Sequence, residues 1–336
     1  MSGQSTVLSF VESQKARRAG RARRAVAALM AGLGVCAIAS LLARPLGAWD
    51  GKGHMMVAYV AYQQLTQATK DRVDKLLRKN PYYKTKWKGL LPDGVNDADK
   101  KMYVFMLAAT WPDEIKGGDD NYKDDALEAG TADEDGNYND KKQHRYWHFV
   151  DLAFSTDSTA VPGTPAPNAE TQIERFRDAL KSNKSDKQKS YDLVWLLHLV
   201  GDVHQPLHCT TRVDAAHQAG DRGGNAVTIC LETCGSDLHT YWDHVLGDAS
   251  KPDEAVPTAQ ALPAADAGKA GNVTTHDWVT ESFGLAKTTV YVDPVLAGVG
   301  PFTLTQPYKD AAKALARQQI ALAGARLARI LNNELK

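Results

Sequence analysis

Apolar residues recur at spacings of three and four along most of the chain after residue 53, which is the periodicity of helices that bury one face. No run of alternating apolar and polar residues is long enough to indicate a sheet of any size. The pattern predicts helices over residues 54–65, 70–79, 169–181, 186–203, 238–246, 275–291 and 308–335. We therefore predict a mainly α fold.

Two connections lack this periodicity. Residues 116–143 are acidic and rich in turn formers, and residues 250–271 are rich in Pro, Ala and Gly. Neither stretch separates two plausible cores, and no internal repeat is visible. Because 336 residues suffice to bury a sizeable core, we predict a single domain over residues 49–336 with two surface excursions.

The first 48 residues differ in composition from the rest. A basic segment, KARRAGRARR, precedes an uninterrupted apolar run over residues 25–42, and the small residue Ala48 follows. This order is typical of a secretory signal peptide. It predicts a secreted or periplasmic chain that begins at Trp49 and is not attached to the membrane after cleavage. The alternative is an uncleaved membrane anchor, because 18 apolar residues approach the roughly 20 that span a bilayer.

Cleavage after Ala48 would change the net charge, which is zero for the whole chain. Residues 1–48 hold seven of the 40 basic side chains and one of the 40 acidic ones, so 33 basic and 39 acidic side chains remain, a formal charge of −6. This balance argues against binding of nucleic acid through a broad basic surface. An anionic ligand would then need local positive charge, which bound metal supplies.

Three cysteines follow the predicted cleavage point, Cys209, Cys230 and Cys234. One disulfide bond with one free thiol is the simplest arrangement, and Cys230 with Cys234 is the local candidate. A zinc ribbon or zinc finger is excluded because the spacing is wrong and the cysteines are too few.

Histidine and aspartate gather in short clusters. The segment HLVGDVHQPLH places His198 and Asp202 four residues apart, so that both lie on one face of a helix, and His208 follows the break at a proline. The segment HTYWDH repeats the spacing with His239 and Asp243. Further candidates stand beside tryptophan or at the start of the first helix: His148 in WHFVD, Asp113 in TWPDEIK and His54 in GKGH.

A single pair of this kind is ordinarily a helix-stabilising contact. Several pairs beside Trp and Leu need another explanation, because buried imidazoles and carboxylates are costly unless they are paired or bound to a cation. Eight candidates exceed what one tetrahedral zinc ion uses. Nitrogen and oxygen ligands without thiolate, in an exported chain, favour two or three zinc ions in a hydrolytic site.

The order W-x4-H, W-x-D, H-F-x-D, H-x3-D-x5-H, D-R-G-G-N and H-x3-D resembles that of the S1/P1 nucleases, zinc-dependent single-strand nucleases of fungi, plants and bacteria. The resemblance covers nearly the whole mature chain, including WVTES and AGARLARILN near its C-terminus. It implies a helical fold of the phospholipase C and P1 nuclease type, with three zinc ions in a cleft. The implied substrates are RNA, single-stranded DNA and 3′-phosphorylated nucleotides, with 5′-phosphorylated products and no stable protein partner.

The resemblance also assigns the metal ligands. The first zinc is expected at Asp113, His148, His198 and Asp202, the second at His208, His239 and Asp243, and the third at His54, Asp202 and the α-amino nitrogen and carbonyl oxygen of Trp49. Because an amide nitrogen is a poor zinc ligand, the role of Trp49 requires cleavage after Ala48. Asp202 would bridge two ions.

Three further residues have expected roles toward the substrate. Lys116, three residues after Asp113, is expected to face the phosphate and to act with Asp113 in hydrolysis by a metal-activated water. Phe149 and Asp151 are expected to bind a nucleobase, the ring by stacking and the carboxylate at the base edge. The alternatives are a solvated lysine for Lys116 and core packing for Phe149.

Two other functions fit the same residues. A zinc-dependent phospholipase C-type phosphodiesterase shares the implied fold and an N-terminal tryptophan, and a non-catalytic zinc-binding protein of the cell envelope would need the ligands alone. The segment GDRGGN is expected to form a tight loop beside the cleft. The histidines without an expected ligand role are His144, His204, His217, His244 and His276, of which His204 is expected to pack behind the ligands.

Overall fold

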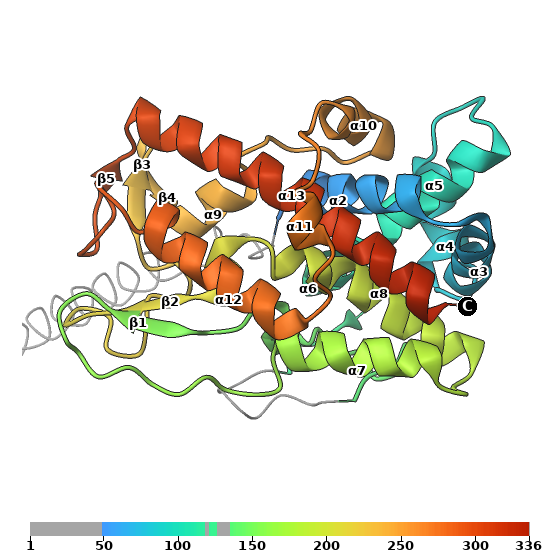
Figure 1. Cartoon of the computed structure of the whole chain (residues 1–336), viewed down its shortest axis with the longest axis horizontal. Coiled ribbons are helices and arrows are strands. Elements are labelled where there is room, and N and C mark those ends of the chain that lie inside the picture. The colour runs from blue at the N-terminus through green and yellow to red at the C-terminus, as the bar shows by residue number, and fades with distance from the viewer. Residues whose placement is uncertain (1–48, 118–120, 126–134, 336) are drawn as a thin grey trace, which may run out of the picture. The chain divides into compact units, whose positions relative to one another are not determined.

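Helices make up most of the part of the chain that the computed structural model describes, which is residues 49–117, 121–125 and 135–335 (Figure 1). These residues lie in one compact unit, and the predicted mainly α fold is confirmed. The predicted signal peptide, residues 1–48, lies outside the described residues. Within the described ranges, no helix combines the length and the apolar character needed to cross a bilayer.

The helices that the periodicity predicts are present with shifted ends. They are α2 (Gly51–Gln64), α3 (Gln67–Leu77), α7 (Ala169–Lys181), α8 (Asp186–Asp202), α9 (Leu238–Asp243), α12 (Thr275–Leu285) and α13 (Gln306–Glu334). Only α7 has the predicted bounds. The helix predicted over residues 275–291 is divided, because α12 ends at Leu285 and a π-helical turn, η5 (Ala286–Val290), follows.

Several helices were not predicted. They are α4 (Tyr82–Thr85), α5 (Asp97–Ala108), α6 (Trp111–Lys116), α10 (Pro252–Gln260), α11 (Ala267–Ala270) and the 3₁₀ helices η1 (Trp87–Leu90), η3 (Arg145–His148) and η4 (Pro206–Cys209). The prediction of a loop over residues 250–271 is therefore wrong. Pro252 stands in the first turn of α10, where proline favours a helix, and α10 packs against α2.

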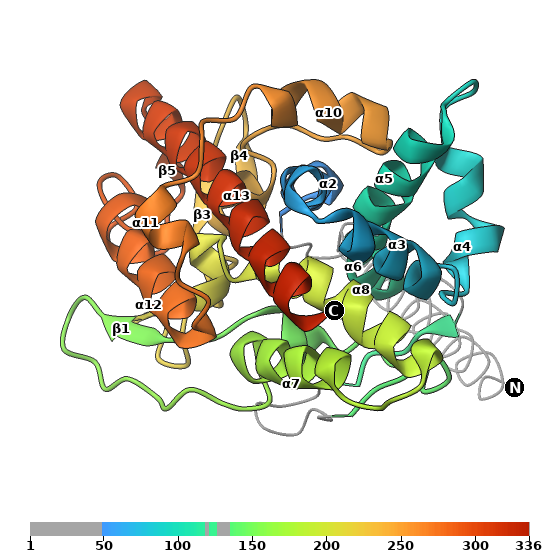
Figure 2. The ribbon, with the colours of Figure 1, turned by 45° about the vertical axis from the view of Figure 1, so that its right-hand side comes forward.

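The longest helix, α13, crosses α2 and α8, and α7 packs alongside α8 (Figure 2). The second half of α8 is buried almost completely, as its apolar sequence requires. Gly324 of α13 allows the crossing with α2, because a Cβ atom there would lie 2.5 Å from the Cβ of Val60. These helices provide the rigid frame that carries His54, His198 and Asp202.

All seven tryptophans are fully buried, and two of them, Trp111 and Trp195, contact each other edge to face beneath the histidine clusters. Tyr122 and Tyr138 pack their rings edge-on against Trp111, at centroid distances of 5.8 and 5.6 Å. Both tyrosines belong to residues 116–143, where the sequence predicts a surface excursion. The described part of that excursion is thus anchored in the core by its aromatic residues.

The strands are short and form two small sheets. In one sheet β1 (Ala153–Ser155) pairs in parallel with β2 (Thr211–Val213), and in the other β3 (Thr228–Cys230) lies between β4 (Cys234–Asp237) and β5 (Phe302–Thr303). The predicted disulfide bond between Cys230 and Cys234 joins β3 to β4, and Cys209 is a buried free thiol. Because β4 leads directly into α9, this hairpin holds the start of the helix that carries His239 and Asp243.

Candidate metal centre and adjacent cavity

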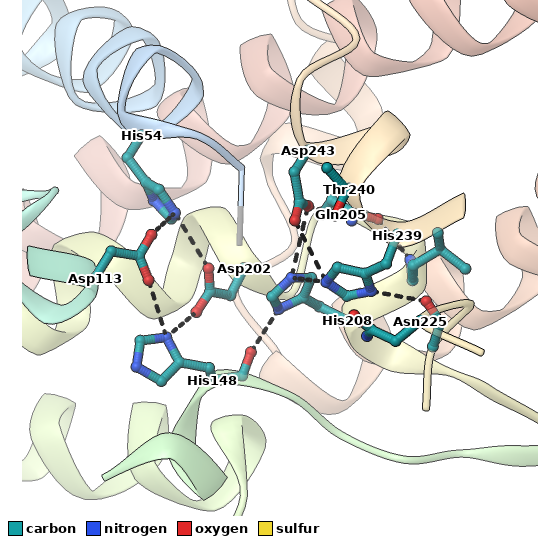
Figure 3. A network of polar contacts seen from close by, with 12 residues as sticks. His54, Asp113, His148, Asp202, Gln205, His208, Asn225, His239, Thr240 and Asp243 are labelled. Carbon is teal, nitrogen blue, oxygen red and sulfur yellow. Dashed lines mark hydrogen bonds and ion pairs between the residues drawn. The ribbon is translucent and has the colours of Figure 1, made fainter. Parts of the chain in front are cut away.

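Eight His and Asp side chains from six elements converge on one region, and Figure 3 labels all of them except His198. They are His54 of α2, Asp113 of α6, His148 at the end of η3, His198 and Asp202 of α8, His208 of η4, and His239 and Asp243 of α9. We divide them into a five-residue cluster (His54, Asp113, His148, His198 and Asp202) and a three-residue cluster (His208, His239 and Asp243). The structure thus brings together every side chain that the sequence predicts as a metal ligand.

The helical spacing of four produces the two His–Asp pairs. His198 Nε2 lies 3.3 Å from Asp202 Oδ2 on α8, and His239 Nε2 lies 3.5 Å from Asp243 Oδ2 on α9. Gly201 leaves room beside the first pair, because a Cβ atom there would lie 2.8 Å from Nδ1 of His54. The His54 ring therefore stacks on His198 with their centroids 3.8 Å apart.

Two carboxylates occupy the centre of the five-residue cluster. Asp202 lies 3.3 Å from His54 Nε2 and 3.2 Å from His148 Nδ1, so its two oxygens face different histidines. Asp113 Oδ1 lies 3.4 Å from His198 Nε2. A carboxylate that faces two sets of nitrogen atoms has the arrangement that the expected bridging role of Asp202 requires.

Backbone carbonyl groups orient three of the imidazoles. The Nδ1 atoms of His198, His208 and His239 lie 2.8, 2.7 and 2.7 Å from the carbonyl oxygens of Ala109, His148 and Gly223. Because a carbonyl oxygen can only accept, each Nδ1 carries the hydrogen and each Nε2 points into the cluster with a lone pair when the ring is neutral. Ligating histidines in proteins are oriented in this manner.

Inside the clusters, acceptor atoms face one another, as they would around a bound cation. His208 Nε2 and His239 Nε2 lie 3.1 Å apart, although both are acceptors when the rings are neutral. His54 Nε2 and Asp202 Oδ1 are buried at 3.3 Å, yet neither has a hydrogen bond within the described part of the chain. Buried lone pairs that face one another are costly without a positive charge between them. A donor set of imidazole and carboxylate without thiolate suits zinc.

The histidines of the five-residue cluster differ in protonation. Burial, with His198 nearby, lowers the pKa of His54 to about 4, and burial with Lys116 nearby lowers the pKa of His148 to about 3. Burial also opposes the charged form of His198, but Asp202 and Asp113 outweigh it and raise its pKa to about 10. The imidazolium of His198 and the ammonium of Lys116 thus balance the two carboxylates, and a metal ion would replace the proton of His198.

The carboxylates of the two clusters behave in opposite ways. Burial raises the pKa of Asp113 and Asp202, but Lys116 and His198 beside Asp113, and His198 beside Asp202, hold both pKa values well below the usual range. In the three-residue cluster burial dominates and raises the pKa of Asp243 well above its usual value. The three-residue cluster therefore lacks the positive charge that would keep its carboxylate ionised.

Gln205 connects the two clusters and was not predicted from the sequence. Its side-chain amide donates to Asp243 Oδ1 at 2.8 Å, and its Oε1 accepts from the backbone N–H of Leu207 at 2.6 Å. Its backbone N–H donates to the carbonyl oxygen of Asp202. Gln205 thus orients the carboxylate of Asp243 and fixes η4, which carries His208. The residue stands within the segment HLVGDVHQPLH, but its spacing alone gives no sign of this role.

Trp49 begins the described chain beside the three-residue cluster. The backbone N–H of Asp50 donates to the carbonyl oxygen of Asp243 at 3.2 Å, and the Trp49 side chain is buried. Asp50 caps α2 through its side chain, which accepts from the N–H of Gly53 at 2.9 Å. The segment at Trp49 and Asp50 is therefore tied to both α9 and α2.

A cavity of about 470 Å³ opens beside the clusters. Three of its lining residues, Lys116, Phe149 and Asp151, are the ones expected to contact the substrate. Lys116 is 7% exposed, and its Nζ lies 2.6 Å from Asp113 Oδ1, so it is a fixed cation and not a solvated lysine. Phe149 is half-buried in the cavity wall, which argues against simple core packing.

Other residues that line the cavity were not predicted from the sequence. Tyr146 places its ring centroid 5.1 Å from that of Phe149, and Arg145, Arg222 and Asn225 add polar groups to the wall. Arg222 and Asn225 belong to the segment GDRGGN, for which the sequence predicts only a tight loop. Their position on either side of the Gly223–Gly224 pair was the available signal.

The remaining histidines lie outside the two clusters. His204 accepts a hydrogen bond from Arg326 and packs near Trp278, and His144 stacks on Trp147. His217 bonds Asp214, and His276 bonds Glu170 at the surface. His244 lies with Asp50 and Asp248 in a largely exposed group, to which we assign no function.

Comparison with known proteins gives the family. The sequence model of the S1/P1 nucleases matches residues 49–336. Endonuclease 2 of Arabidopsis thaliana is 30% identical over 26% of this chain and 27% of its own length. Nuclease S1 of Aspergillus oryzae is 21% identical over 66% of this chain and 61% of its own length. The aligned part thus spans less than two thirds of either relative, whereas the family model covers the described chain from its first residue: the chain belongs to the S1/P1 nuclease family.

Proposed function

We propose that the chain is an exported zinc-dependent nuclease that hydrolyses phosphodiester bonds of single-stranded DNA and RNA to 5′-phosphorylated products and removes the 3′-phosphate of nucleotides. The observation that carries the proposal is the convergence of the eight His and Asp side chains beside a cavity with a fixed lysine. The family match supports phosphodiester hydrolysis.

Three zinc ions are proposed to occupy the centre. Asp113, His148, His198 and Asp202 would hold one, His208, His239 and Asp243 a second, and His54, Asp202 and the Trp49 backbone the third. When bound, they would supply a nucleophile at neutral pH and neutralise the charge that develops on phosphate and leaving oxygen.

The chain's own residues bind and orient the phosphate. The Lys116 ammonium is held by Asp113 at the edge of the cavity, and a preorganised cation stabilises the charge of a phosphoryl transition state. Because Asp113 also faces His198 and His148, the same carboxylate would hold both metal and lysine. Lys116 and the metal centre would thereby act on one phosphate.

The base is proposed to lie on Phe149, with Asp151 at its edge. An aromatic face accepts any nucleobase by stacking, and a paired base cannot reach such a ring without leaving its duplex. This requirement is the physical reason for the proposed preference for single strands.

Export supplies the remaining ligand in this proposal. Cleavage after Ala48 would create the free amine of Trp49, in a segment that the hydrogen bond from the N–H of Asp50 to the carbonyl oxygen of Asp243 holds next to α9. Export would also bring the chain to an oxidising compartment, which the Cys230–Cys234 disulfide bond suits.

The test uses the chain expressed with its own N-terminal segment. We expect a mature terminus at Trp49, about three bound zinc ions, and chelator-sensitive hydrolysis that is faster on single-stranded DNA than on its duplex. Hydrolysis of phosphatidylcholine without release of nucleotides would instead identify a phospholipase C-type enzyme. Bound zinc without turnover of any phosphodiester would identify a zinc-binding protein.

A further inference from the structure

Two oppositely charged side chains, those of Asp151 and Arg222, line the cavity proposed to bind the base, and neither belongs to the two His–Asp clusters. Asp151 is half-buried in the cavity wall and Arg222 is exposed at its rim. Within the described part of the chain, the carboxylate of Asp151 and the guanidinium of Arg222 interact electrostatically with each other, but neither has a hydrogen bond or a close ion pair. Both groups are therefore available to a molecule in the cavity.

The short sheet β1–β2 fixes these two residues relative to each other. The carbonyl oxygen of Leu152, next to Asp151, accepts from the backbone N–H of Thr211 at 3.0 Å. The Thr211 hydroxyl in turn accepts from the backbone N–H of Arg222 at 3.2 Å. Two hydrogen bonds through Thr211 thus connect the segment of Asp151 to the loop of Arg222.

The loop that carries Arg222 is held in an uncommon conformation. Arg222 has φ of +58°, a left-handed conformation that costs free energy for any residue with a side chain. The carboxylate of Asp221 fixes the loop by accepting from the N–H groups of Arg212 and Gly224, at 2.9 and 3.2 Å. A glycine at this position would avoid the strain. The presence of arginine instead indicates that its side chain has a role of its own.

The two charged residues and two aromatic rings line the same cavity. Phe149 and Tyr146 provide the ring surface, and Asp151 is close enough to Tyr146 and Arg222 to interact with both electrostatically. Burial and Asp221 raise the pKa of Asp151 to about 6, while Arg222 opposes the rise. The carboxylate is thus ionised at neutral pH.

Guanine is the base whose edges match these groups. Its N1–H and N2–H groups are adjacent donors for a carboxylate, and its O6 and N7 atoms accept two hydrogen bonds from an arginine. Adenine and cytosine would present a ring-nitrogen lone pair to the carboxylate, and uracil a single N–H between two carbonyl oxygens. We propose that Asp151 and Arg222 form the base-selecting edge of this cavity and that they select guanine, an inference that rests on the nucleotide-binding role proposed above.

Binding of nucleoside 5′-monophosphates to the zinc-loaded protein tests this inference. These probes share one phosphate and one sugar and differ only in the base, and they are products and not substrates of the proposed reaction. Calorimetry is expected to give a Kd for the guanine nucleotide about tenfold below that for the adenine nucleotide. Arg222→Gly is expected to reduce the difference, because Asp151 remains, while the protein keeps its thermal stability, because glycine adopts the left-handed conformation freely.

Lys141→Gly is the matched control. Lys141 is also a cation at a positive φ, +56°, but its ammonium lies over the Tyr122 ring away from the cavity. This variant should keep the guanine preference. Equal Kd values for the four bases in the wild-type protein, or an equal loss of affinity for all four in Arg222→Gly, would overturn the inference, the second because Arg222 would then contact only the phosphate.

Hydrolysis of dinucleotides separates this inference from the proposed function. A guanine preference in binding without hydrolysis of any dinucleotide would contradict the nuclease and leave the base-selecting edge supported. Hydrolysis with equal affinity for the four bases would support the nuclease and overturn guanine selection.

Discussion

The candidate metal centre and the cavity proposed to bind the base lie side by side but are built in opposite ways. Among the eight clustered side chains all but the partly exposed Asp113 are buried, and backbone carbonyls fix three of the five imidazoles. In the base cavity Asp151 and Phe149 are half-buried and Arg222 is exposed. A rigid centre suits metal ions, whose coordination geometry does not vary. An open wall suits nucleobases, which differ in shape. We therefore expect changes in the metal centre to abolish activity and changes in the cavity to alter substrate choice.

Asp202→Asn is expected to have the largest effect. Asp202 faces three histidines, and an amide cannot provide the two anionic oxygens of a bridging ligand. The variant should lose bound zinc and more than about 10³-fold of its activity, as measured by metal analysis and nuclease assay.

Asp192→Asn is the matched control for this change. Asp192 is a buried carboxylate on the same helix, but it accepts from Gln188 and lies in neither cluster. Its substitution should leave the zinc content unchanged. Equal loss of zinc in both variants would indicate that α8 unfolds and that Asp202 is not a specific ligand.

An extra alanine before Trp49 of the mature protein is expected to have the next largest effect. The extension converts the proposed amine ligand to an amide, so one zinc ion should be lost together with activity on the order of 100-fold. Trp49→Phe keeps the amine and should keep the zinc, although it loses packing in the core. Full zinc content in the extended protein would show that the amine is not a ligand.

The sequence was sufficient to predict that these His and Asp side chains come together, because part of their spacing is local. His198 with Asp202, and His239 with Asp243, share helix faces at a spacing of four, and the resemblance to the family assigned the remaining ligands. The hydrophobic periodicity did not predict α10, because the proline-rich composition of this helix resembles that of a loop. It also missed the anchoring of residues 116–143, because the contacts of Tyr122 and Tyr138 with Trp111 depend on tertiary packing.

The cavity could be predicted only in part. Phe149 and Asp151 stand beside His148 in the sequence, whereas Arg222 reaches the cavity through the contact of its loop with β2. Likewise, the hydrogen bond from Gln205 to Asp243 joins residues 38 positions apart. Residues that act through such long-range contacts have no local pattern by which the sequence could identify them.

Gln205→Ala should weaken the metal centre without removing a ligand. Loss of its hydrogen bond leaves Asp243 Oδ1 buried without its donor, and the loss of such a partner typically lowers metal affinity by about 10–100-fold. The measurement is the chelator concentration that removes zinc. Gln319→Ala is the control, since this buried glutamine donates to the carbonyl oxygen of His204 and not to a ligand. Equal zinc retention in the two variants would exclude the role of Gln205.

The pH dependence of base preference should show the smallest effect and sharpens the contrast between the two regions. Burial and Asp221 raise the pKa of Asp151 to about 6 against the opposing charge of Arg222, so the carboxyl group is ionised above that pH and protonated below it. Protonation replaces an acceptor by a donor, and the guanine-to-adenine ratio of affinities should therefore fall as the pH decreases through about 6. Any loss of zinc in acid should affect both nucleotides alike, so the ratio reports the cavity alone. Asp151→Asn has no carboxyl group there to titrate, and a ratio in the wild-type protein that stays as constant with pH as in this variant would contradict the role of Asp151.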